Sequence, residues 1–486
     1  MKQILTFLVL CFAFVWMSAQ ERGDLLSDTL LANFTAAEVN VLYSQNGIPP
    51  GILASDFGVE EYKISYQTID ADGSPTFATG LVVIPVGITC PAPLGVYNHG
   101  TFSDLASMPS NLGTEHMLGV GYAASGYVGV LPDLVGYGDS PGFPNYQHAK
   151  STGTANVDML RAARHFCAGK GIELNGQIFI TGYSQGGHSA MAAHREIETY
   201  YADEFTVTAC APLSGAYDMS GVQTDFVFDD DYYEGNVYLG YIIMAFKEIY
   251  PELIEWEFDE VFQSPYDTIL YNRLTAFNTP LGELNGMLPT NPADLIQPDL
   301  LADFLSNPDH PFRVVLRDND AYDWAPVAPV QMSYCEGDQS IYYQNAIVAQ
   351  NSFIANGATN VTAVSRGASF GHGSCILPAI LASKNWFDSL KEDCTTSGTS
   401  DLMDNDKQNV MAYPNPMGQH TTFMVKNLEY PISQIRIFDL TGKPVLTFSD
   451  VQAHHFTISA DGLQSGMYIA EVTIEGKTQR IKLLVK

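Results

Sequence analysis

The most informative segment of the chain reads Gln177-Ile178-Phe179-Ile180-Thr181-Gly182-Tyr183-Ser184-Gln185-Gly186. Its first half is largely apolar and β-branched, which is typical of a short buried strand, and helix-forming residues follow from Ser189 to Glu198. A Gly-x-Ser-x-Gly pentapeptide between a strand and a helix predicts a nucleophile elbow, a sharp turn that exposes the serine hydroxyl. Ser184 is therefore the expected nucleophile of an acyl-transfer reaction. The pentapeptide alone would also fit a turn of small residues in any α/β protein.

Strand-like and helix-like segments alternate on both sides of this turn. Short apolar runs predict strands at 62–69, 78–85, 94–98, 127–131, 205–211, 330–334 and 361–366, and helices are expected at 115–125 and 153–168. This alternation is typical of an α/β fold whose mainly parallel sheet is covered on both faces. Ligands of such folds meet the carboxyl ends of the strands, which is where Ser184 is expected.

Two regions depart from the alternation. Residues 219–313, approximately, are aromatic, acidic and helix-like, which predicts a helical cap insertion over the site; an ordinary packing extension is the alternative. After a polar linker at 395–407, residues 408–486 hold short strands separated by turn signals, which predicts a small C-terminal all-β sandwich. The catalytic domain is therefore expected to occupy residues 20–394.

The N-terminus has the pattern of a signal peptide. Lys2 is followed by an apolar run that ends in small residues, so cleavage is expected near Ala19 and a signal peptide at residues 1–19. The run is shorter than a membrane span, and no other stretch approaches that length, so no transmembrane segment is expected. Cys11 could indicate a lipid-modified cysteine, but the bulky Leu10 before it argues against that interpretation.

The chain is strongly acidic, with 54 Asp and Glu against 23 Lys and Arg and a formal net charge of −31. Such a surface repels nucleic acid and anionic membranes, so neither is an expected partner. The runs Asp229-Asp230-Asp231 and Asp318-Asn319-Asp320 lack the spacing of a calcium loop. The chain also has no Cys-x-x-Cys or His-Glu-x-x-His zinc motif. We therefore expect neither a metal nor another cofactor.

A serine nucleophile needs a histidine base, and His372 is the expected one. It lies in Ser369-Phe370-Gly371-His372-Gly373, on a predicted glycine-flanked loop directly after the last strand. A surface loop residue is the alternative interpretation. His99 precedes Ser184 on a different strand and is expected to be structural or part of the oxyanion loop. Other histidines fall on predicted helices, in the insertion or in the β-module: His165, His188, His194, His310, His420, His454 and His455.

The histidine in turn needs an acid that fixes its tautomer. The strand predicted at 330–334 leads into Glu336-Gly337-Asp338, which makes Asp338 the best candidate. Asp218, after the preceding strand, is second and Glu336 is third.

Two backbone groups are expected to bind the oxyanion. The helix that follows the elbow places the Gln185 N–H where the negative charge would form. The Thr101 N–H, in His99-Gly100-Thr101 after the strand at 94–98, is the expected second donor.

Six of the seven cysteines lie outside the predicted signal peptide. An even number in an exported chain permits disulfides, whose pairing the spacing does not settle. Cys335 and Cys375 flank the two candidate catalytic loops, which favours their pairing.

Five motifs together resemble an α/β-hydrolase of the secretory lipase type: Asn98-His99-Gly100-Thr101, Pro132-Asp133-Leu134-Val135-Gly136-Tyr137-Gly138-Asp139-Ser140, Gly182-Tyr183-Ser184-Gln185-Gly186-Gly187, Gly337-Asp338 and Gly371-His372. The resemblance spans roughly residues 55–392, and the order Ser, Asp, His is the one described for that fold. It implies hydrolysis of carboxylic esters through an acyl-serine intermediate, without a metal. Carried over by motif, Ser184 is the nucleophile, Asp338 the acid, His372 the base, and Gln185 and Thr101 the oxyanion donors. The family includes lipid-degrading lipases and short-chain esterases, so the substrate stays open.

The tail is similar to the C-terminal sorting domain of the type IX (Por) secretion system. The resemblance covers about residues 408–486 and rests on Tyr413-Pro414-Asn415-Pro416, Leu440-Thr441-Gly442-Lys443 and Leu463-Gln464-Ser465-Gly466-Met467-Tyr468. It implies export through the periplasm of a Gram-negative bacterium to the cell surface or medium, with the sorting machinery as a transient partner.

The leading hypothesis is a secreted serine lipase or carboxylesterase that acts on a small-molecule or lipid ester. A serine peptidase of the prolyl-oligopeptidase type on the same fold is an alternative, and cleavage of peptides in preference to esters would favour it. A non-catalytic surface-binding protein is a further alternative, which failure of a fluorophosphonate probe to label Ser184 would favour.

Overall fold

The computed structural model describes residues 21–392 and 410–485, apart from short gaps at 47, 49–51, 230–231, 414, 416, 426–429 and 440–442. The expected signal peptide at 1–19 and the expected linker at 395–407 lie outside the described residues. Contacts divide the chain into two compact units, one formed by residues up to 34 with 57–394 and the other by 35–56 with 395–486.

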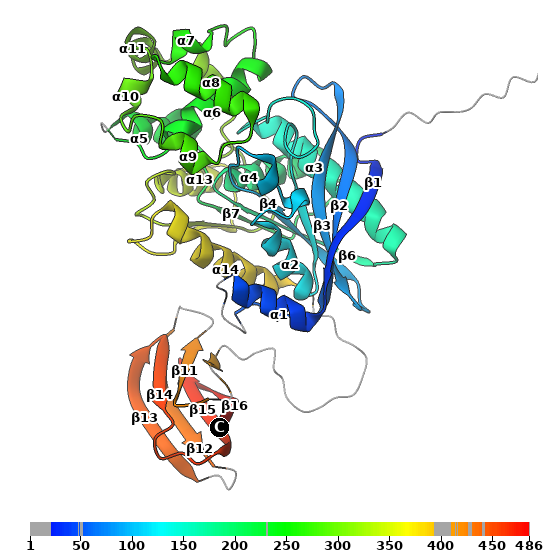
Figure 1. Ribbon diagram of the computed structural model, residues 1–486, viewed down its shortest axis with the longest axis vertical. Coiled ribbons are helices and arrows are strands. Elements are labelled where there is room, and N and C mark those ends of the chain that lie inside the picture. Colours follow the sequence, from blue (N-terminus) through cyan, green and yellow to red (C-terminus); the bar gives the residue numbers. More distant parts are fainter. Residues whose placement is uncertain are drawn as a thin grey trace, which may run out of the picture. The chain divides into compact units, whose positions relative to one another are not determined.

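The first unit is built on a nine-stranded sheet with the strand order β1-β2-β3-β5-β4-β6-β7-β8-β9 (Figure 1). Pairing is antiparallel from β1 to β5 and parallel from β5 to β9. The prediction of a mainly parallel sheet is therefore confirmed. The strands are β1 (Leu25–Phe34), β2 (Gly58–Ile69), β3 (Pro75–Val86), β4 (Ala92–Asn98), β5 (Val128–Pro132), β6 (Leu174–Tyr183), β7 (Ala209–Leu213), β8 (Val330–Tyr334) and β9 (Val361–Ser365).

Strand β1 has no counterpart among the expected strands. Its sequence, LLSDTLLANF, does not alternate between apolar and polar residues, and most of its side chains are exposed. It lies at the edge of the sheet, where it pairs only with β2. Because an edge strand buries little of either face, its sequence carries a weak strand signal.

Helices cover both faces of the sheet (Figure 1). The central strands are buried along their whole length, as β4 and β5 show, so they read as continuous apolar runs rather than alternating ones. Aromatic side chains join one layer to the sheet: Phe179 on β6 contacts both Tyr127 and Phe387, with ring centroids 5.6 and 5.0 Å away. The helices are α2 (His116–Ala124), α3 (Ala149–Lys170), α4 (Gln185–Tyr200), α13 (Gln344–Ala355) and α14 (His372–Leu390), with the short 3₁₀ turns η1 (Leu105–Ser107) and η2 (Pro109–Asn111).

A helical cap insertion separates β7 from β8, as the sequence predicts. Its helices, green in Figure 1, gather at one end of the sheet. They share an apolar core that includes Phe246, Leu270 and Leu295. The same core extends to Tyr137 and Tyr146 of the sheet domain, so the insertion packs directly on the loops beside the elbow. Its elements are η3 (Met219–Gln223), α5 (Thr224–Asp229), α6 (Asn236–Ile249), α7 (Phe258–Val261), α8 (Tyr266–Ala276), α9 (Leu281–Asn285), α10 (Pro292–Leu295), α11 (Pro298–Ser306) and α12 (Pro311–Asp318).

The second unit contains helix α1 (Ala36–Gln45), which begins with a capping box between Thr35 and Glu38, and two small antiparallel sheets. Apolar residues from both sheets, including Phe423, Ile435 and Val472, form one core. This confirms the predicted C-terminal β-sandwich. Its strands are β10 (Val410–Tyr413), β11 (His420–Val425) and β14 (His455–Ser459) in one sheet, and β12 (Ile432–Phe438), β13 (Pro444–Ala453), β15 (Gly466–Ile474) and β16 (Lys477–Val485) in the other.

Candidate active site

Ser184 occupies the turn between β6 and α4 with φ 61° and ψ −119°. A positive φ is uncommon for a residue with a side chain and marks a strained position. The flanking glycines make the turn possible: a Cβ on Gly182 would collide with the Gly186 carbonyl, and one on Gly186 would collide with the Asn98 carbonyl at the end of β4. The elbow that the sequence predicts is therefore present, and it packs tightly against the neighbouring strand.

Three predicted side chains form one hydrogen-bonded row. The Ser184 Oγ lies 2.9 Å from His372 Nε2, and His372 Nδ1 lies 2.7 Å from Asp338 Oδ2. The other oxygen of Asp338 accepts hydrogen bonds from the backbone N–H groups of Ser340 and Ile341, at 2.9 and 2.8 Å. Asp338 is buried, whereas the His372 side chain keeps 16% of its surface exposed. The row therefore runs from a shielded carboxylate, through a partly exposed imidazole, to the hydroxyl of the buried Ser184.

His372 differs from its expected setting in one respect. It is the first residue of α14 rather than a loop residue, and Gly371 caps the helix. The Tyr183 hydroxyl donates to the His372 carbonyl at 2.6 Å, and the two rings lie 5.1 Å apart. Burial raises the pKa of the Tyr183 phenol, so it stays a neutral donor. The residue next to Ser184 thus holds the backbone of His372, a role that no spacing pattern signals.

A disulfide joins the segments that carry the acid and the imidazole. Cys335 follows β8, three residues before Asp338, and pairs with Cys375 in the first turn of α14. The pairing favoured by the sequence is confirmed. Cys167 and Cys210 are free and buried, and burial raises the pKa of the Cys167 thiol to about 12, which leaves it unreactive.

The two weaker acid candidates have other partners. Asp218 caps η3 and accepts from the N–H groups of Gly221 and Val222, at 2.9 and 3.2 Å. Glu336 accepts from the Ser365 hydroxyl at 2.6 Å. Neither carboxylate is bonded to an imidazole.

The other histidines near the sheet have structural contacts. His99 is buried, with Nε2 3.0 Å from the Asp133 carbonyl. His188 Nε2 lies 2.8 Å from the Asn319 carbonyl, and burial lowers its pKa to about 4. Two further histidines, for which the sequence carries no functional signal, are also structural: His116 pairs with Glu61 at 2.7 Å, and His148 caps α3. His372 is thus the histidine that the structure places against Ser184.

The two expected oxyanion donors belong to the elbow itself and to the loop after the neighbouring strand β4. Gln185 is the first residue of α4, so its N–H lies at the positive end of the helix dipole. The segment His99–Thr101 follows β4, which pairs with β6. Within it the Gly100 N–H is already used, because it donates to Glu115 Oε2 at 3.0 Å. The N–H groups of Thr101 and Gln185 have no acceptor among the described residues.

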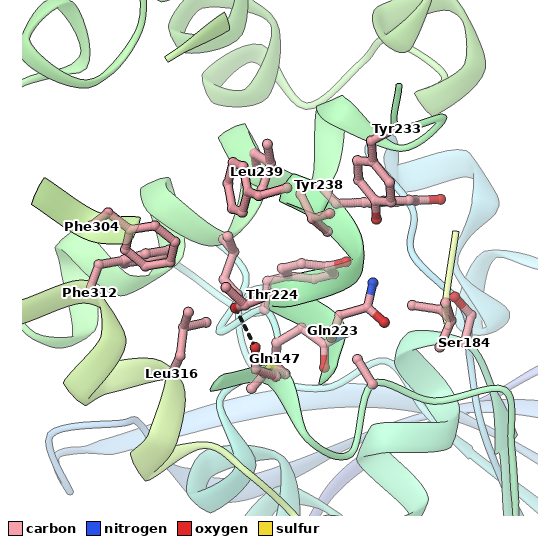
Figure 2. Close-up of a pocket in the computed structure, with 17 residues that line it drawn as sticks. Gln147, Ser184, Gln223, Thr224, Tyr233, Tyr238, Leu239, Phe304, Phe312 and Leu316 are labelled. Atoms are coloured by element: carbon pink, nitrogen blue, oxygen red, sulfur yellow. Dashed lines mark hydrogen bonds between the residues drawn. The ribbon is translucent and has the colours of Figure 1, made fainter. Parts of the chain in front are cut away.

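An apolar cavity leads from Ser184 into the cap insertion (Figure 2). The cavity has a volume of about 90 Å³, which is several times the roughly 10–15 Å³ that one water molecule requires. Figure 2 shows Ser184 at one end and Phe304, Phe312 and Leu316 at the other. Burial raises the pKa of Tyr238, which also lines the cavity, to about 12, so this phenol is neutral. The lining therefore suits an uncharged, apolar group.

A second, smaller apolar cavity lies deeper in the cap. Phe228, Leu239, Phe304 and Phe312 line both cavities and so form the wall between them.

Comparisons with known proteins identify a family for each of two parts of the chain. Residues 105–390 match the secretory lipase family. The chain belongs to this family. Residues 411–486 match a secretion-system C-terminal sorting domain. A sequence comparison with curated proteins gave no match.

Solved structures resemble this secretory lipase over its catalytic part. The rice cell wall degrading esterase LipA from Xanthomonas oryzae aligns with a TM-score of 0.69 and 28% identity, covering 76% of this chain and 100% of that one. Candida antarctica lipase A in its closed state, with a TM-score of 0.57 and 15% identity over 77% of this chain and 84% of that one, shares the fold.

The predictions of a secretory lipase-type α/β-hydrolase, of ester hydrolysis and of export are confirmed by these matches. This secretory lipase is a secreted ester hydrolase with a C-terminal sorting domain. In the part of the chain that the structure describes, no helix is both long and apolar enough to cross a bilayer.

Proposed function

We propose that this secretory lipase hydrolyses carboxylic esters through an acyl-enzyme on Ser184, with His372 as the base and Asp338 as the orienting acid. The hydrogen-bonded row from Ser184 Oγ through His372 to Asp338 is the observation that carries the proposal. Separations of 2.9 and 2.7 Å are within the range that proton transfer requires.

In the first half-reaction His372 Nε2 takes the Ser184 proton while Oγ attacks the ester carbonyl carbon. The N–H groups of Gln185 and Thr101 stabilise the negative charge that forms on the carbonyl oxygen. The bond from carbon to the alcohol oxygen then breaks, and His372 returns its proton to the leaving alkoxide. In the second half-reaction water gives a proton to His372 Nε2 and attacks the acyl carbon. The bond from that carbon to Ser184 Oγ then breaks, and His372 returns the proton to Oγ, which releases the acid and restores Ser184.

Asp338 keeps His372 in the productive tautomer. Its Oδ2 accepts from Nδ1–H, which leaves Nε2 without a proton and able to act as the base. The carboxylate is unable to rotate freely, because its second oxygen accepts two backbone N–H groups.

The acyl part of the substrate would lie in the cavity of the cap insertion. An apolar lining excludes charged groups and is filled favourably by methylene groups, at about 0.8 kcal/mol for each one buried. The cavity therefore favours an ester with an apolar acyl chain, as in lipids, over a sugar ester. The alcohol side would lie toward His372, whose side chain keeps 16% of its surface exposed.

Replacement of the nucleophile tests the proposal. We expect Ser184→Ala to lower kcat for p-nitrophenyl butyrate by at least about 10⁴-fold, because no other hydroxyl reaches His372 in the row. Its circular dichroism should match that of the unmodified protein. Ser189→Ala, on the same helix α4 and also buried, is the matched control and should keep normal turnover. A fluorophosphonate should label the unmodified protein and the Ser189→Ala variant only. Near-normal hydrolysis by Ser184→Ala would refute the proposal.

A further inference from the structure

The segment after β4 that carries Thr101 is held from two sides. Toward the sheet domain, the Gly100 N–H donates to Glu115 at 3.0 Å. Toward the cap, the Tyr241 hydroxyl of α6 donates to the Phe102 carbonyl at 2.9 Å. The backbone is therefore fixed one residue before and one residue after Thr101.

The Tyr241 hydroxyl oxygen also lies 3.3 Å from that of Tyr137, which donates its one proton to the side-chain oxygen of Gln185 at 3.2 Å. Because the single proton of Tyr241 goes to the Phe102 carbonyl, the two phenol oxygens are in contact without a hydrogen bond between them. Tyr241 therefore acts on the Thr101 segment, and Tyr137 supports the Gln185 side chain on its own. Tyr137 and Tyr241 are 1% and 0% exposed, so water does not compete for these bonds.

The geometry of the two donors matters for the reaction rate. An oxyanion site accelerates acyl transfer only if its N–H groups are held in place before the charge develops. Thr101 lies on a segment without regular structure, and Gln185 lies on a helix. The pairing of β4 with β6 and the contact of Gly186 with the Asn98 carbonyl fix where the two segments begin. The bond from Tyr241 to the Phe102 carbonyl adds a fixed point beyond Thr101, and this point comes from the cap insertion.

Tyr241 does not line the cavity beside Ser184. Its ring packs edge-on against Tyr146, with centroids 4.5 Å apart, and against Phe143 at 5.2 Å. Removing the hydroxyl alone would leave these ring contacts in place. The hydroxyl can therefore be examined separately from the packing of the cap.

We propose that Tyr241 is a positioning residue, through which the cap insertion holds the Thr101 N–H in place as an oxyanion donor. This inference rests on the proposed function, because it needs Ser184 to be the nucleophile. With this role of Tyr241, the cap helps to stabilise the transition state in addition to forming a wall of the substrate cavity.

The test uses the full chain with Tyr241→Phe. We expect kcat for p-nitrophenyl butyrate to fall about tenfold, roughly the effect of one ordinary hydrogen bond, while KM stays within twofold. The rate of labelling by a fluorophosphonate should fall by the same factor, since phosphonylation also builds charge on an oxygen beside Gln185. The pH at which kcat/KM reaches half its maximum should not move, because His372 and Asp338 are untouched.

Tyr250→Phe is the matched control. Tyr250 caps the other end of α6 and donates to Asp318 Oδ2 at 2.7 Å, so the variant removes a hydroxyl from the same helix without touching the Thr101 segment. Its kcat should stay within twofold of normal. Equal losses of kcat in both variants would assign the effect to the cap fold and overturn the inference, as would normal kcat in Tyr241→Phe.

A second variant decides the matter if Tyr241→Phe does not fold. Tyr241→Met also removes the bond to the Phe102 carbonyl while it fills the place of the ring with a flexible apolar side chain, and it should lower kcat at unchanged KM; a normal kcat there would overturn the inference. Ser184→Ala in the same assay separates the two proposals. If Ser184→Ala is active, the proposed function fails. If it is inactive while the tyrosine variants turn over normally, only the positioning role fails.

Discussion

Asp338→Asn is the substitution whose consequence the structure defines most sharply. In the native protein one carboxylate oxygen accepts from His372 Nδ1 and the other accepts from the N–H groups of Ser340 and Ile341. An asparagine oxygen can replace only one of the two. If the oxygen stays on Ser340 and Ile341, the amide NH₂ faces His372 Nδ1. That nitrogen must then accept, so the imidazole proton moves to Nε2 and the ring no longer takes a proton from Ser184.

The opposite orientation of the amide is unfavourable. It would turn the NH₂ group toward two backbone donors and leave both N–H groups unsatisfied in a buried site. Each such loss costs about 1–3 kcal/mol, so the orientation that blocks catalysis is favoured by about 2–6 kcal/mol. A wrong tautomer in a serine hydrolase lowers turnover about 10⁴-fold, equivalent to about 5 kcal/mol of transition-state stabilisation.

The assay compares kcat/KM for p-nitrophenyl butyrate in Asp338→Asn and in Glu336→Gln. Glu336 lies two residues before Asp338 and bonds to Ser365, so its variant should remain within about threefold of normal. Both proteins should unfold at nearly the same urea concentration. Turnover by Asp338→Asn within tenfold of normal would refute the reasoning, and so would an equal loss in Glu336→Gln.

Two further predictions concern the cap and the pH dependence of stability. Leu239→Trp, on the wall between the two apolar cavities, should lower kcat/KM for a long acyl chain at least about tenfold relative to butyrate; an unchanged chain-length profile would place the acyl group elsewhere. Burial raises the pKa of Asp320 to about 6, so between about pH 4 and 6 the folded protein keeps a proton that the unfolded chain has released. The free energy of unfolding should therefore fall by up to about 3 kcal/mol as the pH rises through this window. Asp320→Asn should lack that fall in urea titrations, and parallel profiles would contradict it.

The elbow could be predicted because its signal is local. Gly182, Ser184 and Gly186 are needed where a strand turns directly into a helix, and the clash of any added Cβ with the Asn98 or Gly186 carbonyl gives the physical reason. The approach of Asp338 and His372 could be predicted for a related reason. Both follow parallel strands on the same side of β6, and the carboxyl ends of parallel strands meet at one edge of the sheet.

Other features had no comparable signal. Strand β1 is exposed and lacks an alternating pattern, so periodicity could not reveal it. The position of His372 on α14 was missed because the helix starts among glycines, which favour a loop in any reading of local propensity. In both places the tertiary structure overrides the local preference of the chain.

The contact between Tyr241 and the segment that carries Thr101 shows why function is harder to predict than fold. Tyr241 and Phe102 are 139 residues apart, and they belong to the cap and to the loop after β4. No strand or helix period relates them, because their contact arises only when the insertion folds back on the sheet domain. A buried hydroxyl must find a partner, but sequence alone does not say which carbonyl it will be. If Tyr241 holds the Thr101 segment as proposed, part of the catalytic geometry is encoded in the insertion, and replacing the cap would change kcat as well as substrate preference.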